Sequence, residues 1–414
     1  MRDIRIKVAI ALSYLIFAVL LNSVGTVILQ STEYFRVSKL AASTLEAAKD
    51  LPIALVSFLV AVWLPRFGLR RGIIAGLSVV GLACAAMPVA DAFWATRLLF
   101  VAIGISFAVV KVSTYASVGL LTATPRDHAS LLNVIEGVFM LGVLGGSWLF
   151  SAFIDAGDPA SPRWLQVYWW LAGGCALAVV LLATARLDER AAHGETAPTS
   201  VSAALAAMWH LGREPLTMVF VPAVFLYVMI EQGIGTWLPT FNREFLGLSA
   251  PLSVQTASIF AGGLALGRLG AGALVRRTGW FALLVTCLIG MAALILVALP
   301  LARLGAGGAV TRWSDAPLAA LVLPLIGVLM APIYPAINSA VLSAIAPPRQ
   351  STMVGLIVVF SALGGTTGSL IIGRVFAVVG AAQAFYLLLV PIALLLATVV
   401  ALRRAVADKS VPLA

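Results

Sequence analysis

The sequence predicts an all-α membrane protein with twelve transmembrane helices in two groups of six. Of its 414 residues, 61% are hydrophobic and only 11% are charged, and the mean hydropathy is +1.05. Soluble domains are about half apolar and about a quarter charged. Apolar runs of about 20 residues, enough to cross a bilayer, recur throughout, and one long polar stretch lies near the middle. A water-soluble enzyme, a disordered chain and a nucleic-acid-binding domain are therefore excluded.

The twelve predicted spans follow one another with short connections. The continuous apolar runs argue against a transmembrane barrel, which needs short alternating strands. The first run is too long for a signal-peptide core and has no small-residue cleavage site after it, so we expect it to be retained. The predicted spans are residues 7–30, 44–65, 72–91, 94–121, 129–154, 164–186, 215–240, 252–275, 279–300, 317–345, 351–378 and 381–402.

The placement of Lys and Arg predicts the orientation, because cytoplasmic loops carry an excess of both. Sixteen fall on the side that carries both termini, six fall on the other side, and five lie in or at the edges of spans. We therefore expect a multi-pass protein of the cell inner membrane with both termini in the cytoplasm. The net charge of +10 is scattered over span ends, so it indicates no nucleic-acid partner.

The polar stretch between the sixth and seventh spans divides the chain nearly in half. We expect an N-terminal six-helix bundle at 1–186, a cytoplasmic linker at 187–214, and a C-terminal six-helix bundle with a short tail at 215–414. Val201–Leu211 is predicted to form a short surface helix on the linker.

The two halves resemble each other locally, which predicts a duplicated six-helix unit. The loops "PRFGLRRG" (65–72) and "VRRTGW" (275–280) both place Arg-x-Gly in a turn between two spans. A shift of 223 aligns the segments that begin at Pro125 and Pro348. It superposes Pro125 on Pro348, Arg126 on Arg349, Gly142 on Gly365 and Gly145 on Gly368. Duplicated halves that rock about a midplane site are a recurring transporter design.

Twelve spans, the 6 + 6 duplication, the central linker and the basic turns together resemble the major facilitator superfamily across essentially the whole chain. The resemblance implies a pseudo-twofold fold that works by alternating access. It also implies gating or structural roles for the basic residues of the two turns, Arg66, Arg70 and Arg277. "RLLFVAIGIS", which begins at Arg97, resembles the superfamily's fourth-span motif; snorkelling to the interface is the alternative for Arg97.

A narrower resemblance links spans seven and eight to the fucose/galactose/gluconate–proton symporter branch. It is carried by "FLYVMIEQGIGTWLPTF" (225–241) and "SIFAGGLALGRLGAG" (258–272). The sequence departs from that branch at Thr26 and Lys111, where sugar symporters of the branch carry acids. The matching residues are Glu231, Gly235, Trp237, Gly263, Gly267 and Arg268.

Charged residues inside spans are candidates for function, because a charge at the bilayer centre costs about 2.5–3.5 kcal/mol on insertion scales. Lys111 and Glu136 lie at similar depths in consecutive spans, so an ion pair between them is possible. We interpret Lys111 as a ligand for an anionic or hydroxyl-rich substrate and Glu136 as a proton carrier. A purely structural salt bridge is the alternative.

Two further acids are candidates for proton coupling. Asp50 lies about two turns into span two, where burial would favour its protonated form; a solvated residue at the pore mouth, helped by Glu46 and Lys49, is the alternative. Glu231 lies in the outer third of span seven, beside Gln232. Its alternative is a hydrogen-bond anchor in a helix broken at Gly233 and Gly235.

A polar and aromatic set at comparable depth completes the predicted substrate site. The prolines of "APIYPAINSA" (331–340) are expected to break their helix and leave carbonyls unpaired, and broken helices near the midplane point to binding sites. Simple kinking and packing are the alternatives. The repeat predicts that Lys111 and Tyr334 face each other across the pseudo-twofold. The predicted substrate-binding residues are Lys111, Tyr115, Trp237, Tyr334, Asn338, Asn22 and Gln232.

The sequence therefore predicts a monomeric secondary active transporter of a small polar or anionic solute, working by proton-coupled symport. A proton-coupled exporter of drugs or metabolites and a lipid flippase are the alternatives. Cys84, Cys175 and Cys287 lie singly in apolar runs, so neither a disulfide nor a metal site is expected. The sequence has no phosphate-binding loop and no nucleophile–base constellation, so we expect no cofactor and no enzymatic activity.

Overall fold

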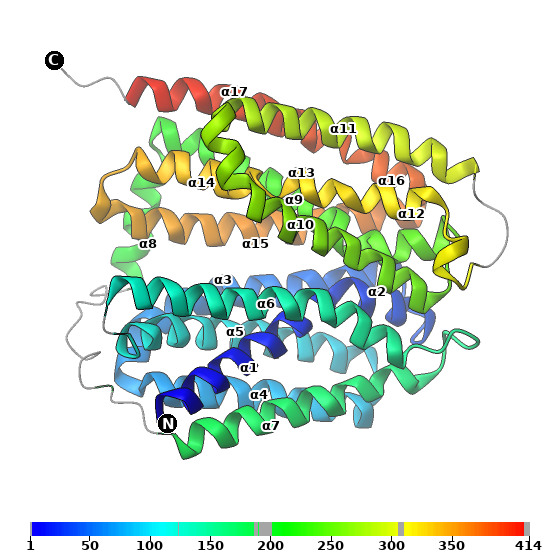
Figure 1. The fold of residues 1–414 in the computed structure, drawn as a ribbon, viewed down its shortest axis with the longest axis horizontal. Helices are drawn as coiled ribbons and strands as arrows, with labels where there is room; N and C mark the ends of the chain where they lie inside the picture. The colour runs from blue at the N-terminus through cyan, green and yellow to red at the C-terminus, as the bar shows by residue number, and fades with distance from the viewer. Residues whose placement is uncertain (1, 123, 186–188, 190–200, 305–309, 410–414) are drawn as a thin grey trace. The chain divides into compact units, whose positions relative to one another are not determined.

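The computed structural model describes residues 2–122, 124–185, 189, 201–304 and 310–409; of these, residues 2–3, 58, 61–66, 125, 129, 201, 203–204, 303–304, 347–348, 351 and 407–409 are described by their backbone alone. Helices make up nearly all of this described part, and its β-structure is a single isolated bridge between Leu248 and Val310. The prediction of an all-α protein is confirmed. Figure 1 shows long helices joined by short connections.

The α-helices are α1 (Arg2–Asn22), α2 (Val24–Glu33), α3 (Lys39–Phe67), α4 (Leu69–Ala90), α5 (Phe93–Leu120), α6 (Pro125–Phe153), α7 (Val167–Thr184), α8 (Val201–Gly212), α9 (Pro215–Glu244), α10 (Ala250–Thr278), α11 (Trp280–Leu304), α12 (Leu318–Val322), α13 (Ile326–Met330), α14 (Ile333–Ser343), α15 (Pro347–Val378), α16 (Ala381–Leu387) and α17 (Leu389–Lys409). Short 3₁₀ turns are η1 (Pro162–Gln166), η3 (Trp313–Asp315) and η4 (Leu323–Leu325).

Eleven helical segments of the described chain are long and apolar enough to cross a membrane. They coincide with the predicted spans except the second, which corresponds to α3, a helix of 29 residues. The predicted surface helix is also confirmed, as α8 begins at Val201. The chain is thus a multi-pass helical membrane protein.

The chain divides into two compact units, one of residues 1–37 and 45–203 and the other of residues 38–44 and 204–414. In the first unit, α1 packs against α6 and α7, while α4 packs against α5 and α7. Gly142 lets α6 approach α1 closely, because a Cβ there would lie 2.6 Å from the carbonyl oxygen of Leu15. Close approach through small residues is a common way for helices to pack in lipid.

The second unit repeats this contact between α15 and α9, its largest helix pair. A Cβ on Gly364 would lie 2.3 Å from the carbonyl oxygen of Phe225, and one on Gly368 would lie 2.3 Å from that of Met229. In the first unit the α6 glycines that contact α1 are Gly142 and Gly146. The contacts therefore repeat one residue out of register with the sequence alignment, which paired Gly142 with Gly365.

Residues 38–44, which include the first turn of α3, group with the second unit. Within that unit, Lys39 Nζ lies 2.7 Å from Glu244 Oε2 and 5.0 Å from the centre of the Phe376 ring. The single helix α3 thus contributes residues to both units.

Interruptions occur in the first, tenth and twelfth predicted spans, the last between α16 and α17, and one expected break is absent. The tenth span is divided into α12, η4, α13 and α14, and its last break falls at Pro332, as the prolines predicted. The expectation that span seven breaks at Gly233 and Gly235 was wrong, because α9 is continuous. These glycines serve packing instead, since a Cβ on Gly235 would lie 3.0 Å from the Phe260 ring.

An unpredicted break interrupts the first span between α1 and α2, at Ser23. The Ser23 hydroxyl donates to the carbonyl of Leu20 at 2.8 Å. Such local hydrogen bonds compete with the helical ladder. The broken span places Asn22 at the end of α1, where its side chain is exposed and its amide donates to the carbonyl of Ala18 at 2.8 Å.

Candidate functional site

The first unit brings Tyr115 of α5 and Glu136 of α6 into direct contact. The Tyr115 hydroxyl donates to Glu136 Oε1 at 2.6 Å, a short distance typical of a hydrogen bond to a charged acceptor. Tyr115 is 40% exposed, and Glu136 is exposed as well. Two predicted site residues therefore form one polar pair on neighbouring helices.

Lys111 lies one helical turn before Tyr115 on α5 and is exposed. Its ammonium lies 5.7 Å from the centre of the Phe107 ring, within the range of a cation–π contact. Among the described residues, Lys111 forms no ion pair within 4.0 Å, and Glu136 is bound by Tyr115 instead. The ion pair that the sequence made possible is thus not formed in this conformation, and the ammonium is available to another anion.

An aromatic cluster from three helices supports this polar group. Phe107 lies 5.6 Å from Phe17 and 6.3 Å from Phe139, measured between ring centres. Tyr14 of α1 joins the cluster at 6.0 Å from Phe139, and its buried hydroxyl has no hydrogen-bond partner in the described part of the chain. Sequence reasoning missed Tyr14, whose only signal was a hydroxyl within the first apolar span.

Asp50 lies in a buried charged cluster on α3 rather than alone. Lys49 Nζ lies 2.6 Å from Glu46 Oε1 and 3.4 Å from Asp50 Oδ1. Side-chain exposure is 6% for Lys49, 0% for Glu46 and 11% for Asp50. The alternative of a solvated acid at a pore mouth does not fit this burial, whereas the pairing with Lys49 and Glu46 is present.

The Lys49 ammonium also reaches the break in the first span. It lies 3.5 Å from the carbonyl oxygen of Leu21, one of the carbonyls that the end of α1 leaves without an intrahelical donor. Asn22, predicted to contact substrate, is the next residue. The break, Lys49 and the two acids therefore form one connected group in the first unit.

The second unit holds a carboxylate–cation pair on α9 and α10. Glu231 Oε1 lies 3.9 Å from Arg268 Nη2 and accepts a hydrogen bond of 3.3 Å from the Tyr227 hydroxyl. Side-chain exposure is 20% for Glu231 and 46% for Arg268. Gln232, a half-buried neighbour on α9, lies beside Glu231 as the sequence indicated, whereas the sequence did not predict the contact between Glu231 and Arg268.

Tyr334 and Asn338 of α14 extend this group. The Tyr334 ring lies 5.3 Å from that of Tyr227, and its hydroxyl lies 3.3 Å from Ser361 Oγ and also contacts the Asn338 side chain. Asn338 Oδ1 is buried and has no hydrogen-bond partner among the described residues. A buried acceptor without a donor is costly, so this oxygen is a candidate ligand for a substrate hydroxyl.

Trp237 has different neighbours from the residues of this polar group. Its side chain is fully buried, and its indole N–H lies 3.1 Å from the Ser369 carbonyl oxygen and 3.3 Å from its hydroxyl. The ring also stacks on Phe376 at 5.5 Å. All these partners belong to α15, so the structure places Trp237 in the packing between α9 and α15.

Of the four predicted gating residues, Arg70 has the best-defined surroundings. Its guanidinium donates to the carbonyls of Leu182 at 3.3 Å and of Ala185, at the end of α7. Arg97 stacks on Phe93 at 4.7 Å in the first turn of α5, which fits snorkelling. Arg277 is exposed at the end of α10, and the side chain of Arg66 lies outside the described residues.

The turn before α4 contains a contact that the sequence did not suggest. The Glu189 carboxylate accepts hydrogen bonds of 2.9 Å from the backbone N–H groups of Leu69 and Arg70. It therefore caps the start of α4, where N–H groups lack intrahelical partners and favour negative charge. Gly68, with φ of 96°, makes the turn that presents them.

Broken spans, buried charges within apolar helices and two compact helical units are features of helical membrane transporters. A sequence model of the Major Facilitator Superfamily matches residues 9–369. The chain belongs to this superfamily.

Solved transporters share the fold at low sequence identity. The nucleoside transporter NupG has a TM-score of 0.73 and 13% identity over 96% of this chain and 99% of its own. A D-xylose–proton symporter has a TM-score of 0.70 and 14% identity over 99% of both chains. The transporter FucP in its outward conformation has a TM-score of 0.60 and 17% identity over 99% of this chain and 100% of its own. No relative among curated proteins matches the sequence.

Proposed function

We propose that this protein is a secondary active transporter of the inner membrane that moves a small polar or anionic solute by proton-coupled symport. The observation that carries the proposal is the exposed ammonium of Lys111, which lies within a membrane-spanning helix and makes no ion pair with a described carboxylate. Ionisable residues at such positions are expensive and mark substrate or ion pathways.

In this proposal Lys111 binds an anionic or hydroxyl-rich group of the substrate, and Glu136 carries the proton. The Tyr115 hydroxyl positions the Glu136 carboxylate through a hydrogen bond of 2.6 Å to Oε1. A deprotonated Glu136 competes with the substrate for Lys111, whereas protonation removes that competition. Proton and substrate occupancy would be coupled in this way.

The second unit supplies further candidate ligands. Asn338 offers a buried oxygen without a hydrogen-bond donor, and Tyr334 and Gln232 lie near the Glu231–Arg268 pair. Glu231 and Asp50 remain secondary candidates for the proton. Proton coupling is also supported by the resemblance of the fold to a D-xylose–proton symporter.

Proteoliposomes with an imposed pH gradient test the coupling role. Glu136→Gln should abolish pH-driven uptake and leave substrate exchange intact, because exchange needs no net movement of a proton. Asp50→Asn and Glu231→Gln serve as matched variants in the same assay. Equal loss of uptake and exchange in Glu136→Gln would contradict the assignment.

A thermal-shift screen of sugars, sugar acids and other organic anions identifies the substrate class. A compound that stabilises the wild type and not Lys111→Ala would define both the ligand and its site. The same proteoliposomes, loaded with labelled lipid, would reveal movement of lipid between leaflets if the protein were a flippase. Acidification that drives efflux would instead indicate an exporter.

A further inference from the structure

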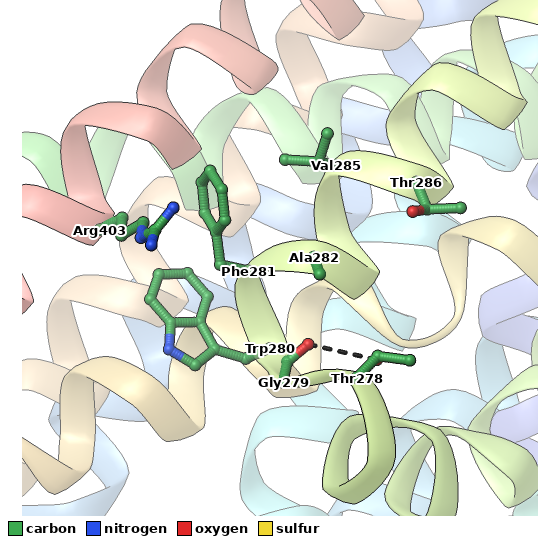
Figure 2. A pocket seen from close by; sticks show the side chains of 8 residues that line it. All are labelled: Thr278, Gly279, Trp280, Phe281, Ala282, Val285, Thr286 and Arg403. Carbon is green, nitrogen blue, oxygen red and sulfur yellow. Dashed lines mark hydrogen bonds between the residues drawn. The ribbon is translucent and has the colours of Figure 1, made fainter.

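The second unit contains a hollow of about 580 Å³ where α10 gives way to α11 and α17 passes alongside. Figure 2 shows Arg403 reaching from α17 toward the rings of Trp280 and Phe281 at the start of α11. Thr278 and Thr286 also line the hollow. The Arg403 guanidinium lies 4.4 Å from the centre of the Phe281 ring.

The first unit has a corresponding place, and there an anion occupies it. The turns before α4 and α11 are the two Arg-x-Gly turns of the repeat, and both contain a glycine of positive φ, Gly68 at 96° and Gly279 at 76°. In the first unit the Glu189 carboxylate accepts from the backbone N–H groups at the start of α4. Glu189 comes shortly after α7 in the sequence, and Arg403 lies near the end of α17.

The hollow of the second unit is positively charged and contains no described carboxylate. The first N–H groups of α11 lack intrahelical acceptors. Arg403 forms no ion pair with any carboxylate of the described chain, and the stacking on Phe281 leaves the edge of its guanidinium available for hydrogen bonds. The hollow therefore combines one arginine, the start of a helix and open space, and it lacks the carboxylate that caps the corresponding turn of the first unit.

We propose that this hollow binds the phosphate of an anionic phospholipid headgroup. Both α10 and the first part of α11 are membrane-spanning segments, so the turn between them lies at the membrane surface, with Trp280 and Phe281 as interfacial aromatic residues. Basic pockets between spans on the cytoplasmic side are suited to such headgroups. The excess of Lys and Arg at this end of the spans predicts the cytoplasmic leaflet, which is the anionic one.

The test measures phosphatidylglycerol binding to the full-length protein by native mass spectrometry, with titration in nanodiscs. Arg403→Gln should weaken binding roughly tenfold, because it removes a charge-assisted hydrogen bond to the phosphate in addition to the general surface charge that Arg404 shares. Arg404→Gln is the matched control, because it removes the same charge from the next residue, which is exposed like Arg403 but does not line the hollow. Arg403→Lys, which keeps the charge, should retain most of the affinity. Melting of each variant in phosphatidylcholine checks folding.

Three results would overturn the proposal. The first is equal weakening in Arg403→Gln and Arg404→Gln, which would indicate general surface charge. The second is saturation by millimolar inorganic phosphate with the same dependence on Arg403, which would identify a soluble anion as the ligand. The third is lipid binding that appears only in Asp408→Asn. Asp408 is the acid that follows Arg403 in the sequence, and this result would mean that its carboxylate competes with the lipid for Arg403 in the wild type. If Arg403→Gln does not fold, Arg403→Lys is used in its place. The proposal then requires that Arg403→Lys bind phosphatidylglycerol more strongly than it binds phosphatidylcholine.

Discussion

Each unit contains a tyrosine–glutamate pair beside a cation, and the two arrangements differ in where the cation lies. In the first unit, Tyr115 donates to Glu136 at 2.6 Å and Lys111 makes no ion pair with a described residue. In the second, Tyr227 donates to Glu231 at 3.3 Å and Arg268 lies 3.9 Å from the same carboxylate. The comparison teaches that similar residues leave one cation available to a ligand and keep the other near its internal partner.

The largest expected effect is the loss of substrate binding in Lys111→Ala. Removing one partner of a desolvated charge pair costs about 2 kcal/mol or more, which corresponds to roughly a 30-fold weaker affinity. Arg268→Ala should weaken binding less, because Glu231 already offsets part of its charge. Ligand titration by thermal shift or calorimetry measures both, and equal losses would erase the difference between the units.

Trp237→Phe should lower stability rather than transport. The substitution removes the buried hydrogen bond from the indole N–H to Ser369, measured at 3.1 Å to the carbonyl oxygen, at a cost of about 1 kcal/mol. Thermal melting should show the loss, while transport per folded molecule should stay within about twofold of wild type. A selective loss of substrate affinity with an unchanged melting temperature would instead place Trp237 in the binding site.

Glu231→Gln should destabilise the protein more than Glu136→Gln does. The first variant removes the carboxylate beside Arg268, and the partial exposure of that arginine limits the cost to about 1 kcal/mol or less. The second removes a charge that has no described cation within 4.0 Å. Melting temperatures of the two purified variants in one detergent decide the order, and the reverse order would mean that Glu136 stabilises the fold through a cation.

The smallest effects concern the two tyrosine hydroxyls. Tyr115→Phe removes the 2.6 Å hydrogen bond to Glu136, the proposed proton carrier, and should therefore change the pH profile of uptake. Tyr227→Phe removes a longer bond of 3.3 Å and should cost about 0.5 kcal/mol, with an unchanged pH profile. Initial uptake rates across pH 5–8 compare the two variants, and identical profiles would contradict the distinction.

The fold was largely predictable because spans follow from length and apolarity alone. The break near Pro332 was predicted for the same kind of reason, since proline removes a backbone donor. The break at Ser23 was missed, because serine permits either a helix or a local hydrogen bond and the neighbouring structure decides between them. The break expected at Gly233 and Gly235 is absent, because these glycines allow close contacts with neighbouring side chains within a continuous helix.

The sequence indicated candidate residues for the site, but it did not specify the contacts among them. Depth along the helices brought Lys111 and Glu136 to one level, but rotation about each helix decides which side chains meet, and Tyr115 meets Glu136 instead. Trp237 shows the same limit, since its depth says nothing about whether it faces a ligand or α15. The Arg268–Glu231 pair needed the packing of α9 on α10, which the sequence does not specify.

Glu189 determines where the protein can be divided into two pieces. It lies beyond the last span of the first half, yet it caps the start of α4. Co-expressed halves separated after Glu189 would keep this cap within the first fragment, whereas separation after Ala185 would remove Glu189 together with residues 186–188. The shorter fragment should accumulate to a lower level in cells even though both contain the same six spans.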